Sequence, residues 1–328
     1  MTHHQRPLGT GFTAASTASE VLRGIDLTGK NVIVTGGNGR LGLETTRALA
    51  QAGASVTVAA RNLESAGRAI ADIPRAEVSQ LDLVDPRSID GFAERWLASQ
   101  RPLHILVNSA TSFPIPPERT LDARGYEIQL ATSHLGHFQL TLALLPALRA
   151  AHGARVVNLS SGAQRFGIVR WDDPHFATGG YAPHVAYAQA KMANVLFTVE
   201  LDRRFAKEGI RAFAVHPGVI VDPQTPGTSR FASLRAQGLL DEAGAPIIDP
   251  ERGKKTVQQG ASTIVLAAAS PLLDDIGGVY LKDNDVSRTD DEPRPLTPDS
   301  IPSEVTSRSI EPESARRLWD LSEELLKK

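Results

Sequence analysis

The sequence predicts an α/β protein built on a doubly wound parallel sheet of about seven strands, with helices on both faces. Short β-rich runs alternate with longer runs of helical spacing between residues 31 and 281. The first short run, residues 31–35, reads NVIVT, and such a nearly continuous apolar run is typical of a parallel strand buried on both faces. A glycine-rich turn follows it directly. Together these features favour the α/β class.

Each expected strand is a short apolar run, and a stretch of helical spacing follows most of them. The expected strands are residues 31–35, 55–60, 76–81, 103–108, 155–159, 211–216 and 278–281. The expected helices are residues 41–52, 62–71, 88–99, 124–151, 185–207, 254–269 and 311–326. Right-handed crossovers between the strands then predict the order 3-2-1-4-5-6-7.

A single domain is expected over residues 29–282, with an extension at each end, residues 1–28 and 283–328. The second extension ends in the last helix. Residues 219–253 interrupt the alternation after the sixth strand, and we predict that this lid segment covers a substrate at the carboxyl edge of the sheet. Its apolar residues favour a bulky apolar substrate and are Phe231, Leu234, Leu239 and Leu240. The other interpretations are an oligomer contact or a loop without fixed structure.

The composition excludes several classes of function. The 328 residues carry a net charge of -2, so neither a nucleic acid nor a membrane surface is expected as a partner. The absence of cysteine excludes disulfides, thiolate catalysis and cysteine-based zinc sites. His134 and His137 have a spacing that could suit a metal, but no third ligand converges with them, so no metal is expected. No run is apolar for long enough to span a membrane, and a cytoplasmic protein is expected.

The turn after the first strand has the pattern of a dinucleotide site. Residues 35–42 read TGGNGRLG, in which Gly37, Gly39 and Gly42 satisfy Gly-x-Gly-x-x-Gly. Backbone N–H groups and the helix dipole at such a turn can bind a pyrophosphate. The alternative is an ordinary tight turn, but the place of the motif between a strand and a helix favours the cofactor site.

The end of the second strand indicates which nicotinamide cofactor is bound. An acidic residue there would hydrogen-bond the ribose 2′-hydroxyl and repel a 2′-phosphate, but Ala60 and Arg61 stand at this position. The planar guanidinium of Arg61 suits a phosphate, and Arg40 offers a second positive charge. NADP(H) is therefore predicted in preference to NAD(H). The alternative is that Arg61 is a solvated residue beside the start of a helix.

Tyr187 and Lys191 are four residues apart, so on one helix their side chains share a face. A nearby ammonium would stabilise the Tyr187 phenolate and bring its pKa, roughly 10 when unperturbed, closer to neutrality. Tyr187 could then exchange a proton with a substrate oxygen, while Ser161 at the end of the fifth strand hydrogen-bonds the same oxygen. On spacing alone, a tyrosine and a lysine four residues apart on a helix are a common coincidence and do not indicate a catalytic site.

Five motifs, taken in order, resemble the short-chain dehydrogenase/reductase family. They are TGGNGRLG at 35–42, NSA at 108–110, NLSS at 158–161, YAQAK at 187–191 and HPG at 216–218. Residues 186–198, AYAQAKMANVLFT, are similar to the retinol-dehydrogenase-like branch and to the oxidoreductase domain of the WW-domain-containing oxidoreductase. The resemblance covers roughly residues 12–282 and implies a Rossmann fold, a nicotinamide cofactor and oxidoreductase activity.

The resemblance also implies the roles of particular residues. Ser161 corresponds to the catalytic serine, Tyr187 to the acid–base tyrosine and Lys191 to the lysine that holds the nicotinamide ribose, while Ser133 occupies the place of a fourth catalytic residue. The residues expected to bind the cofactor are Gly36, Asn38, Gly39, Arg40, Leu41, Gly42, Arg61, Asn62, Asp82, Leu83, Asn108, Ser109, Ala110, Tyr187, Lys191, Pro217, Gly218 and Val219. Assembly into a homodimer or homotetramer through the helices at 124–151 and 185–207 is implied as well.

Three positions depart from the family pattern. Arg40 stands where glycine is usual, Ser133 where an asparagine helps to distort its helix, and Asp222 where a threonine often contacts the cofactor carboxamide. The predicted function is hydride transfer between NADP(H) and a carbonyl or alcohol of a bulky apolar small molecule. Two alternatives stay open because of Arg40 and Ser133. They are a non-redox catalyst of elimination, isomerisation or cyclisation, and an NADP(H)-binding sensor.

Overall fold

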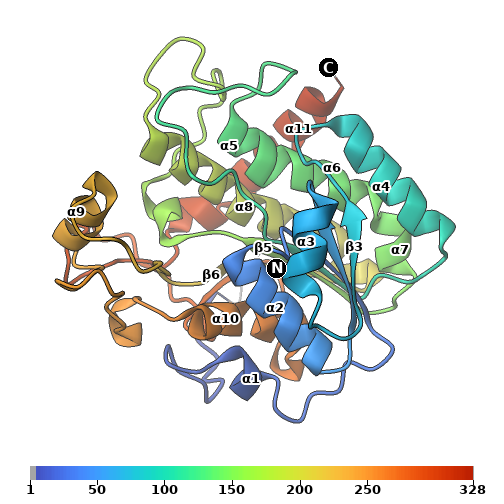
Figure 1. The fold of residues 1–328 in the computed structure, drawn as a ribbon. Coiled ribbons are helices and arrows are strands. Elements are labelled where there is room, and N and C mark those ends of the chain that lie inside the picture. Colours follow the sequence, from blue (N-terminus) through green and yellow to red (C-terminus); the bar gives the residue numbers. More distant parts are fainter. Residues whose placement is uncertain (1–4, 328) are drawn as a thin grey trace.

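The computed structural model describes residues 5–327 and contains one sheet of eight strands in the order β3-β2-β1-β4-β5-β6-β7-β8 (Figure 1). Neighbouring strands pair in parallel, except that β8 is antiparallel to β7. The predicted doubly wound fold is therefore confirmed, with one short edge strand more than expected. The first four residues of the predicted N-terminal extension lie outside the described range. The strands are β1 (Asn31–Thr35), β2 (Ser55–Ala60), β3 (Ala76–Gln80), β4 (Ile105–Asn108), β5 (Ala154–Leu159), β6 (Ile210–His216), β7 (Val279–Lys282) and β8 (Asp285–Val286).

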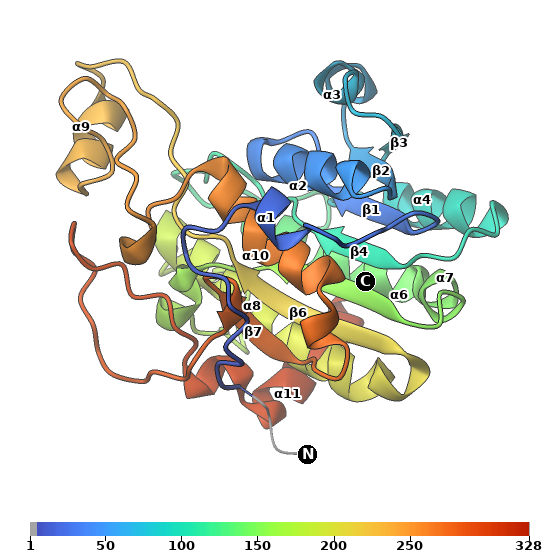
Figure 2. The same cartoon turned by 90° about the horizontal axis from the view of Figure 1, so that it is seen from below.

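Helices connect the parallel strands and cover both faces of the sheet. They are α1 (Ala18–Val21), α2 (Arg40–Gln51), α3 (Leu63–Ile70), α4 (Pro86–Ala98), α5 (Ile128–Leu130), α6 (Gly136–Ala143), α7 (Leu145–Arg149), α8 (Pro183–Phe205), α9 (Ser229–Ala236), α10 (Val257–Ala269) and α11 (Pro312–Leu326). In Figures 1 and 2, α9 of the lid segment stands apart from the helices that cover the sheet.

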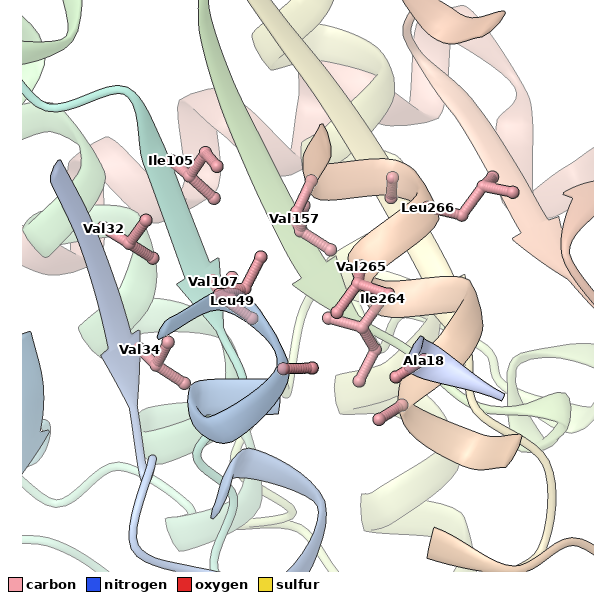
Figure 3. Packing of buried hydrophobic residues seen from close by; sticks show 14 of the residues in the cluster. Ala18, Val32, Val34, Leu49, Ile105, Val107, Val157, Ile264, Val265 and Leu266 are labelled. Carbon is pink, nitrogen blue, oxygen red and sulfur yellow. The ribbon is translucent and has the colours of Figure 1, made fainter. Parts of the chain in front are cut away.

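Two apolar layers, one on each face of the sheet, hold the helices to the strands. On one face, Val32 and Val34 of β1 pack in the same cluster as Leu49 of α2 and Ile264 of α10 (Figure 3). On the other face, Ile33 of β1 lies in a cluster with residues of α4, α6 and α8. Burying one such aliphatic side chain contributes about 1.5–3 kcal/mol. Because both faces are covered, the central strands consist mainly of apolar residues.

The prediction of one continuous helix over residues 124–151 is wrong, because this segment forms several shorter helices. It starts only at α5, where the carboxylate of Glu127 accepts hydrogen bonds from two backbone N–H groups, at 3.0 and 2.9 Å. A π-helix, Ala131–Leu135, then separates α5 from α6. Pro146 stands near the start of α7, and proline cannot donate the N–H that a continuing helix needs. The π-helix that interrupts this segment therefore contains Ser133.

The helix α8 is buried along most of its length because the sheet lies on one side of it and α11 on another. Leu318 of α11 belongs to the same apolar cluster as Leu196 and Val199 of α8. Trp319 packs against Phe197, with ring centroids 6.0 Å apart. A helix that is apolar on all sides requires cover on all sides, and here the chain's own last helix provides part of it.

The N-terminal segment closes the β7–β8 edge of the sheet. The side-chain amide of Gln5 donates hydrogen bonds to the carbonyl oxygens of Tyr280, at 2.9 Å, and Ser287, at 2.7 Å. The backbone N–H of Tyr280 donates back to Gln5 Oε1 at 2.9 Å. Within residues 5–327, no helix has both the length and the apolar character required to cross a membrane.

Candidate active site

A cleft of about 910 Å³ lies at the carboxyl ends of the parallel strands. Its walls are the segments that follow β1 to β6, together with part of the lid segment. In open α/β sheets, ligands bind at this edge, where the connections change direction. Of the residues expected to bind the cofactor, all except Asn108 line this cleft.

The glycine-rich turn after β1 forms one end of the cleft. Gly36 has a φ of 64°, which favours glycine, and a Cβ atom on Gly42 would lie only 2.3 Å from the carbonyl oxygen of Gly36. Gly39 is the N-cap of α2 and carries no side chain that would occupy the helix end. The turn therefore leaves a space that a Cβ would fill and presents a helix N-terminus to the cleft, which fits a pyrophosphate.

Arg61 and Asn62 follow β2 and line the cleft. Asn62 is the N-cap of α3, and its Oδ1 accepts a hydrogen bond from the backbone N–H of Ser65 at 2.9 Å. The carbonyl oxygen of Arg61 accepts a hydrogen bond from Gln80 Nε2, also at 2.9 Å, so the backbone at this position is tied to β3. The exposed Arg61 side chain is therefore presented from an ordered turn.

Asn108 is turned away from the cleft. Its side-chain amide is buried and donates to Asn158 Oδ1 at 2.8 Å and to Thr141 Oγ1 at 3.2 Å. The backbone N–H groups of Ser109 and Ala110 instead donate to Thr35 Oγ1, at 2.9 and 3.1 Å. Ser109 and Ala110 thus line the cleft while Asn108 joins neighbouring strands below it.

Ser133 lies in the π-helix and does not line the cleft, but it is connected to it. Its hydroxyl lies 2.8 Å from Thr111 Oγ1, and Thr111 is a lining residue. Its carbonyl oxygen accepts a hydrogen bond from His137 Nδ1 at 3.0 Å, and His137 Nε2 lies 2.8 Å from Thr35 Oγ1. Neither Thr111 nor this role of His137 was predictable from the sequence, because the Thr111–Ser133 and His137–Thr35 contacts join segments distant in the chain.

Tyr187, Lys191 and Ser161 come together where α8 passes the end of β5. The Ser161 hydroxyl lies close enough to the Tyr187 phenol to affect its pKa, and both Tyr187 and Lys191 line the cleft. Lys191 Nζ donates to the carbonyl oxygen of Leu159 at 3.2 Å and lies 5.5 Å from the centre of the Tyr187 ring. The predicted helical face of α8 is therefore present with a phenol and a buried amine, and the Ser161 hydroxyl approaches it from the end of β5.

The pKa of Tyr187 does not follow the expectation. Burial raises the pKa of Tyr187 above its ordinary value, and the hydrogen bond from Ser161 opposes this only in part. The Lys191 ammonium is directed to Leu159, so it does not stabilise the phenolate as expected. Burial also lowers the pKa of Lys191 to about 8. In this state Tyr187 holds its proton, as a group that donates a proton must.

Arg40 lies at the rim of the cleft and pairs with the lid segment. Its Nε lies 2.7 Å from Asp222 Oδ1, and its Nη2 donates to the carbonyl oxygen of Val221 at 3.2 Å. Arg40 and Asp222, two of the three departures from the family pattern, are therefore in direct contact.

Apolar side chains form part of the lining of the cleft. Phe113 and Ile128 line it, as do Leu234 and Leu239 of the lid segment. Phe231 and Leu240, also expected here, are buried but do not line the cleft. Phe113 is 66% exposed, so it offers an apolar surface to a ligand.

Known proteins resemble this chain over most of its length. A "Probable oxidoreductase" of Streptomyces lividans is 43% identical over 314 residues, which cover 92% of this chain and 99% of that protein. Human retinol dehydrogenase 12 is 36% identical, with 92% of this chain and 88% of that protein covered. The human WW domain-containing oxidoreductase is 34% identical, with 96% and 72% covered.

A solved structure and a family model agree with these relatives. The crystal structure of an uncharacterized protein from Mycobacterium paratuberculosis has a TM-score of 0.70 and 30% identity, and the match covers 96% of this chain and 98% of that one. The family model described as short chain dehydrogenase matches residues 30–230. The chain therefore belongs to the short-chain dehydrogenase family and has the fold of its oxidoreductases.

Proposed function

We propose that this chain is an NADP(H)-dependent oxidoreductase that transfers hydride between the cofactor and a carbonyl or alcohol carbon of a bulky apolar small molecule. The observation that carries the proposal is the position of Tyr187 and Lys191, which line the same cleft as the glycine turn of α2. The cofactor, when bound, supplies or accepts the hydride. The protein residues must then bind, orient and exchange the proton.

Three side chains account for the proton transfer. In reduction, Tyr187 donates its hydroxyl proton to the substrate oxygen, because burial keeps that proton in place until the oxygen gains charge. The Ser161 hydroxyl, which lies beside Tyr187, turns to donate its hydrogen to the same oxygen when substrate is bound and stabilises the developing charge. Lys191 holds the ribose side of the cofactor, with its amine 5.5 Å from the centre of the Tyr187 ring. In oxidation, the same groups act in reverse.

The preference for NADP(H) rests on the end of β2. Arg61 lines the cleft without an acidic residue beside it on this strand, and its guanidinium suits the 2′-phosphate. The preference for a bulky apolar substrate rests on Phe113, Ile128, Leu234 and Leu239. Apolar side chains of this kind bury the apolar surface of a ligand.

A second candidate function is supported by Ser133. The carbonyl oxygen of Ser133 accepts a hydrogen bond from His137, and its hydroxyl is engaged by Thr111. These contacts engage the carbonyl and the hydroxyl of Ser133, the two groups that would have to take part in proton transfer beside Lys191. The second candidate is therefore an NADP(H)-binding protein that catalyses a non-redox step or acts as a sensor.

Binding and turnover distinguish these functions. Purified protein is titrated with NADPH and, separately, NADH, and loss of reduced-nicotinamide absorbance is followed with a panel of bulky aldehydes and ketones. We expect tight binding of NADPH, weaker binding of NADH and turnover of apolar substrates. Tight binding without turnover would favour the second candidate. Equal affinity for both cofactors would contradict the role of Arg61, and binding of neither would contradict the whole proposal.

A further inference from the structure

The two walls of the cleft are joined by an ion pair between Arg40 and Asp222. Arg40 is the first residue of α2 and belongs to the glycine turn, whereas Asp222 lies in the lid segment. Arg40 Nε lies 2.7 Å from Asp222 Oδ1, and Arg40 Nη2 donates to the carbonyl oxygen of Val221 at 3.2 Å. One guanidinium therefore holds two successive residues of the lid segment.

This pair lies where the lid segment leaves its anchored base. On one side of Asp222, the backbone of Val219 bonds to that of Gly253, at 2.8 Å, and to that of Lys255, at 2.9 Å, so the base is part of the fold. On the other side, the chain runs on to α9, which carries Leu234 into the cleft. Arg40 thus fastens the lid segment at the first point beyond its base.

Both partners also line the cleft that we assign to the cofactor. A lone carboxylate at Asp222 would repel the phosphates of a dinucleotide, and a lone arginine at Arg40 would attract them. Because the two charges neutralise each other, neither side chain is free to act alone. Two of the three guanidinium nitrogens of Arg40, Nε and Nη2, already have partners in the lid segment, so we infer that Arg61, rather than Arg40, binds the 2′-phosphate.

We propose that Arg40 and Asp222 form a strap that closes the lid segment across the phosphate-binding part of the cleft, so that the cofactor enters and leaves only when the pair opens. The proposal rests on the proposed function in one respect, namely that a nicotinamide dinucleotide occupies this cleft. It replaces the sequence-based expectation that Arg40 contacts the 2′-phosphate.

The exposure of the pair suits a strap that opens. The two side chains are 43% and 50% exposed, so water and salt screen their attraction. Exposed ion pairs are weak and break and form readily. Such a pair slows the release of a ligand without preventing it, and this effect decreases as ionic strength rises.

The test is the rate of NADPH release, measured by stopped-flow fluorescence after an excess of NADP⁺ is added. The variants are Arg40→Ala, Asp222→Asn, the double variant, and the charge swap Arg40→Asp with Asp222→Arg. Both single variants are expected to release NADPH about five-fold faster, and the double variant no faster than either. The charge swap is expected to recover part of the slow release. Salt should speed release from the wild type more than from the single variants, because only the wild type keeps the ion pair.

Arg47→Ala is the matched control. Arg47 lies on the same helix and forms an ion pair of similar length, 2.8 Å, with Asp72, and neither residue lines the cleft. This variant is expected to release NADPH at the wild-type rate. If Arg47→Ala accelerates release as much as Arg40→Ala does, the faster release results from a less stable α2, and the strap is excluded.

The direction of the change separates the strap from a phosphate ligand. If Arg40 binds phosphate directly, Arg40→Ala weakens NADPH binding while Asp222→Asn strengthens it, and this opposite response would overturn the proposal. Additive effects in the double variant would overturn it as well. Hydrogen exchange of the lid segment without cofactor provides a readout that does not depend on the proposed function. The strap predicts faster exchange over residues 223–240 in both single variants, and unchanged exchange contradicts it even if no nucleotide binds.

Discussion

The guanidinium of Arg165 donates a hydrogen bond to the carbonyl oxygen of Asp290 at 2.8 Å. Arg165 lies four residues after Ser161, and its other donors reach the carbonyl oxygens of Glu292, at 2.9 Å, and Glu304, at 3.1 Å. The side chain is almost fully buried. The C-terminal extension is thereby fastened to the loop that carries Ser161, and it forms part of the support of the site.

Replacing Arg165 should therefore affect both stability and activity. Arg165→Ala removes the donor to the buried carbonyl oxygen of Asp290 and to the partly buried ones of Glu292 and Glu304, so we expect the free energy of unfolding to fall by about 2 kcal/mol. The position of Ser161 should loosen, which lowers kcat more than it changes KM. Urea unfolding and steady-state kinetics measure the two effects. Arg68→Ala, in an exposed pair with Glu64 on α3, is the control and should be near wild type, whereas a stable, fully active Arg165→Ala would exclude this role.

The assignment of Arg61 predicts a change in cofactor preference. Arg61→Ala removes the cation that we place at the 2′-phosphate, so the Kd for NADPH should rise about ten-fold, equivalent to about 1.4 kcal/mol. NADH has no such phosphate and serves as the matched ligand, for which the Kd should hardly change. Fluorescence titration measures both constants. An equal loss of affinity for both cofactors would mean that Arg61 supports the turn rather than the phosphate.

Three buried histidines predict a loss of stability in mild acid. Burial lowers the pKa of His134 to about 3, of His137 to about 4 and of His216 to about 3. In the unfolded chain their pKa returns to about 6.5, so the unfolded state binds protons below that pH and the folded state does not. The free energy of unfolding should therefore fall as the pH drops from about 6.5 to about 4, by up to about 1.4 kcal/mol per pH unit for each histidine.

The histidine prediction can be checked with one conservative variant. His134 Nε2 donates to Ser322 Oγ at 2.7 Å, and the side-chain amide of glutamine can make a similar bond without titrating. His134→Gln should reduce the slope of stability against pH by about one third between pH 7 and 5. Urea midpoints at several pH values give the slope. A wild-type protein whose stability is flat over this range would contradict the buried neutral state of these rings.

The central strands were predictable because they are buried on both faces. Residues 31–35 and 55–60 coincide with expected runs, since a buried parallel strand leaves an apolar run in the sequence. Residues 124–151 were not, because their apolar spacing suits a helix, and only contacts with other segments show where it is interrupted. The same limit applies to Asn108. Its side chain is hydrogen-bonded to Asn158, fifty positions further along the chain, and therefore does not line the cleft.

The site was predictable as a set of residues but not as a set of contacts. The motifs indicated Ser161, Tyr187 and Lys191, yet the direction of the Lys191 amine toward Leu159 and the pairing of Arg40 with Asp222 depend on folding. Assembly into a homodimer or homotetramer stays a prediction. Because α11 packs against α8, less of the α8 surface is left for contact with a second copy of the chain.

The central claim is that Tyr187 exchanges the proton while the cofactor exchanges the hydride. Tyr187→Phe removes one oxygen atom and keeps the ring, so it tests that claim most directly. We predict that NADPH binds this variant within about two-fold of the wild-type affinity, while turnover of the best aldehyde or ketone falls by at least about 100-fold. Turnover near the wild-type rate, with NADPH still bound, would contradict the mechanism.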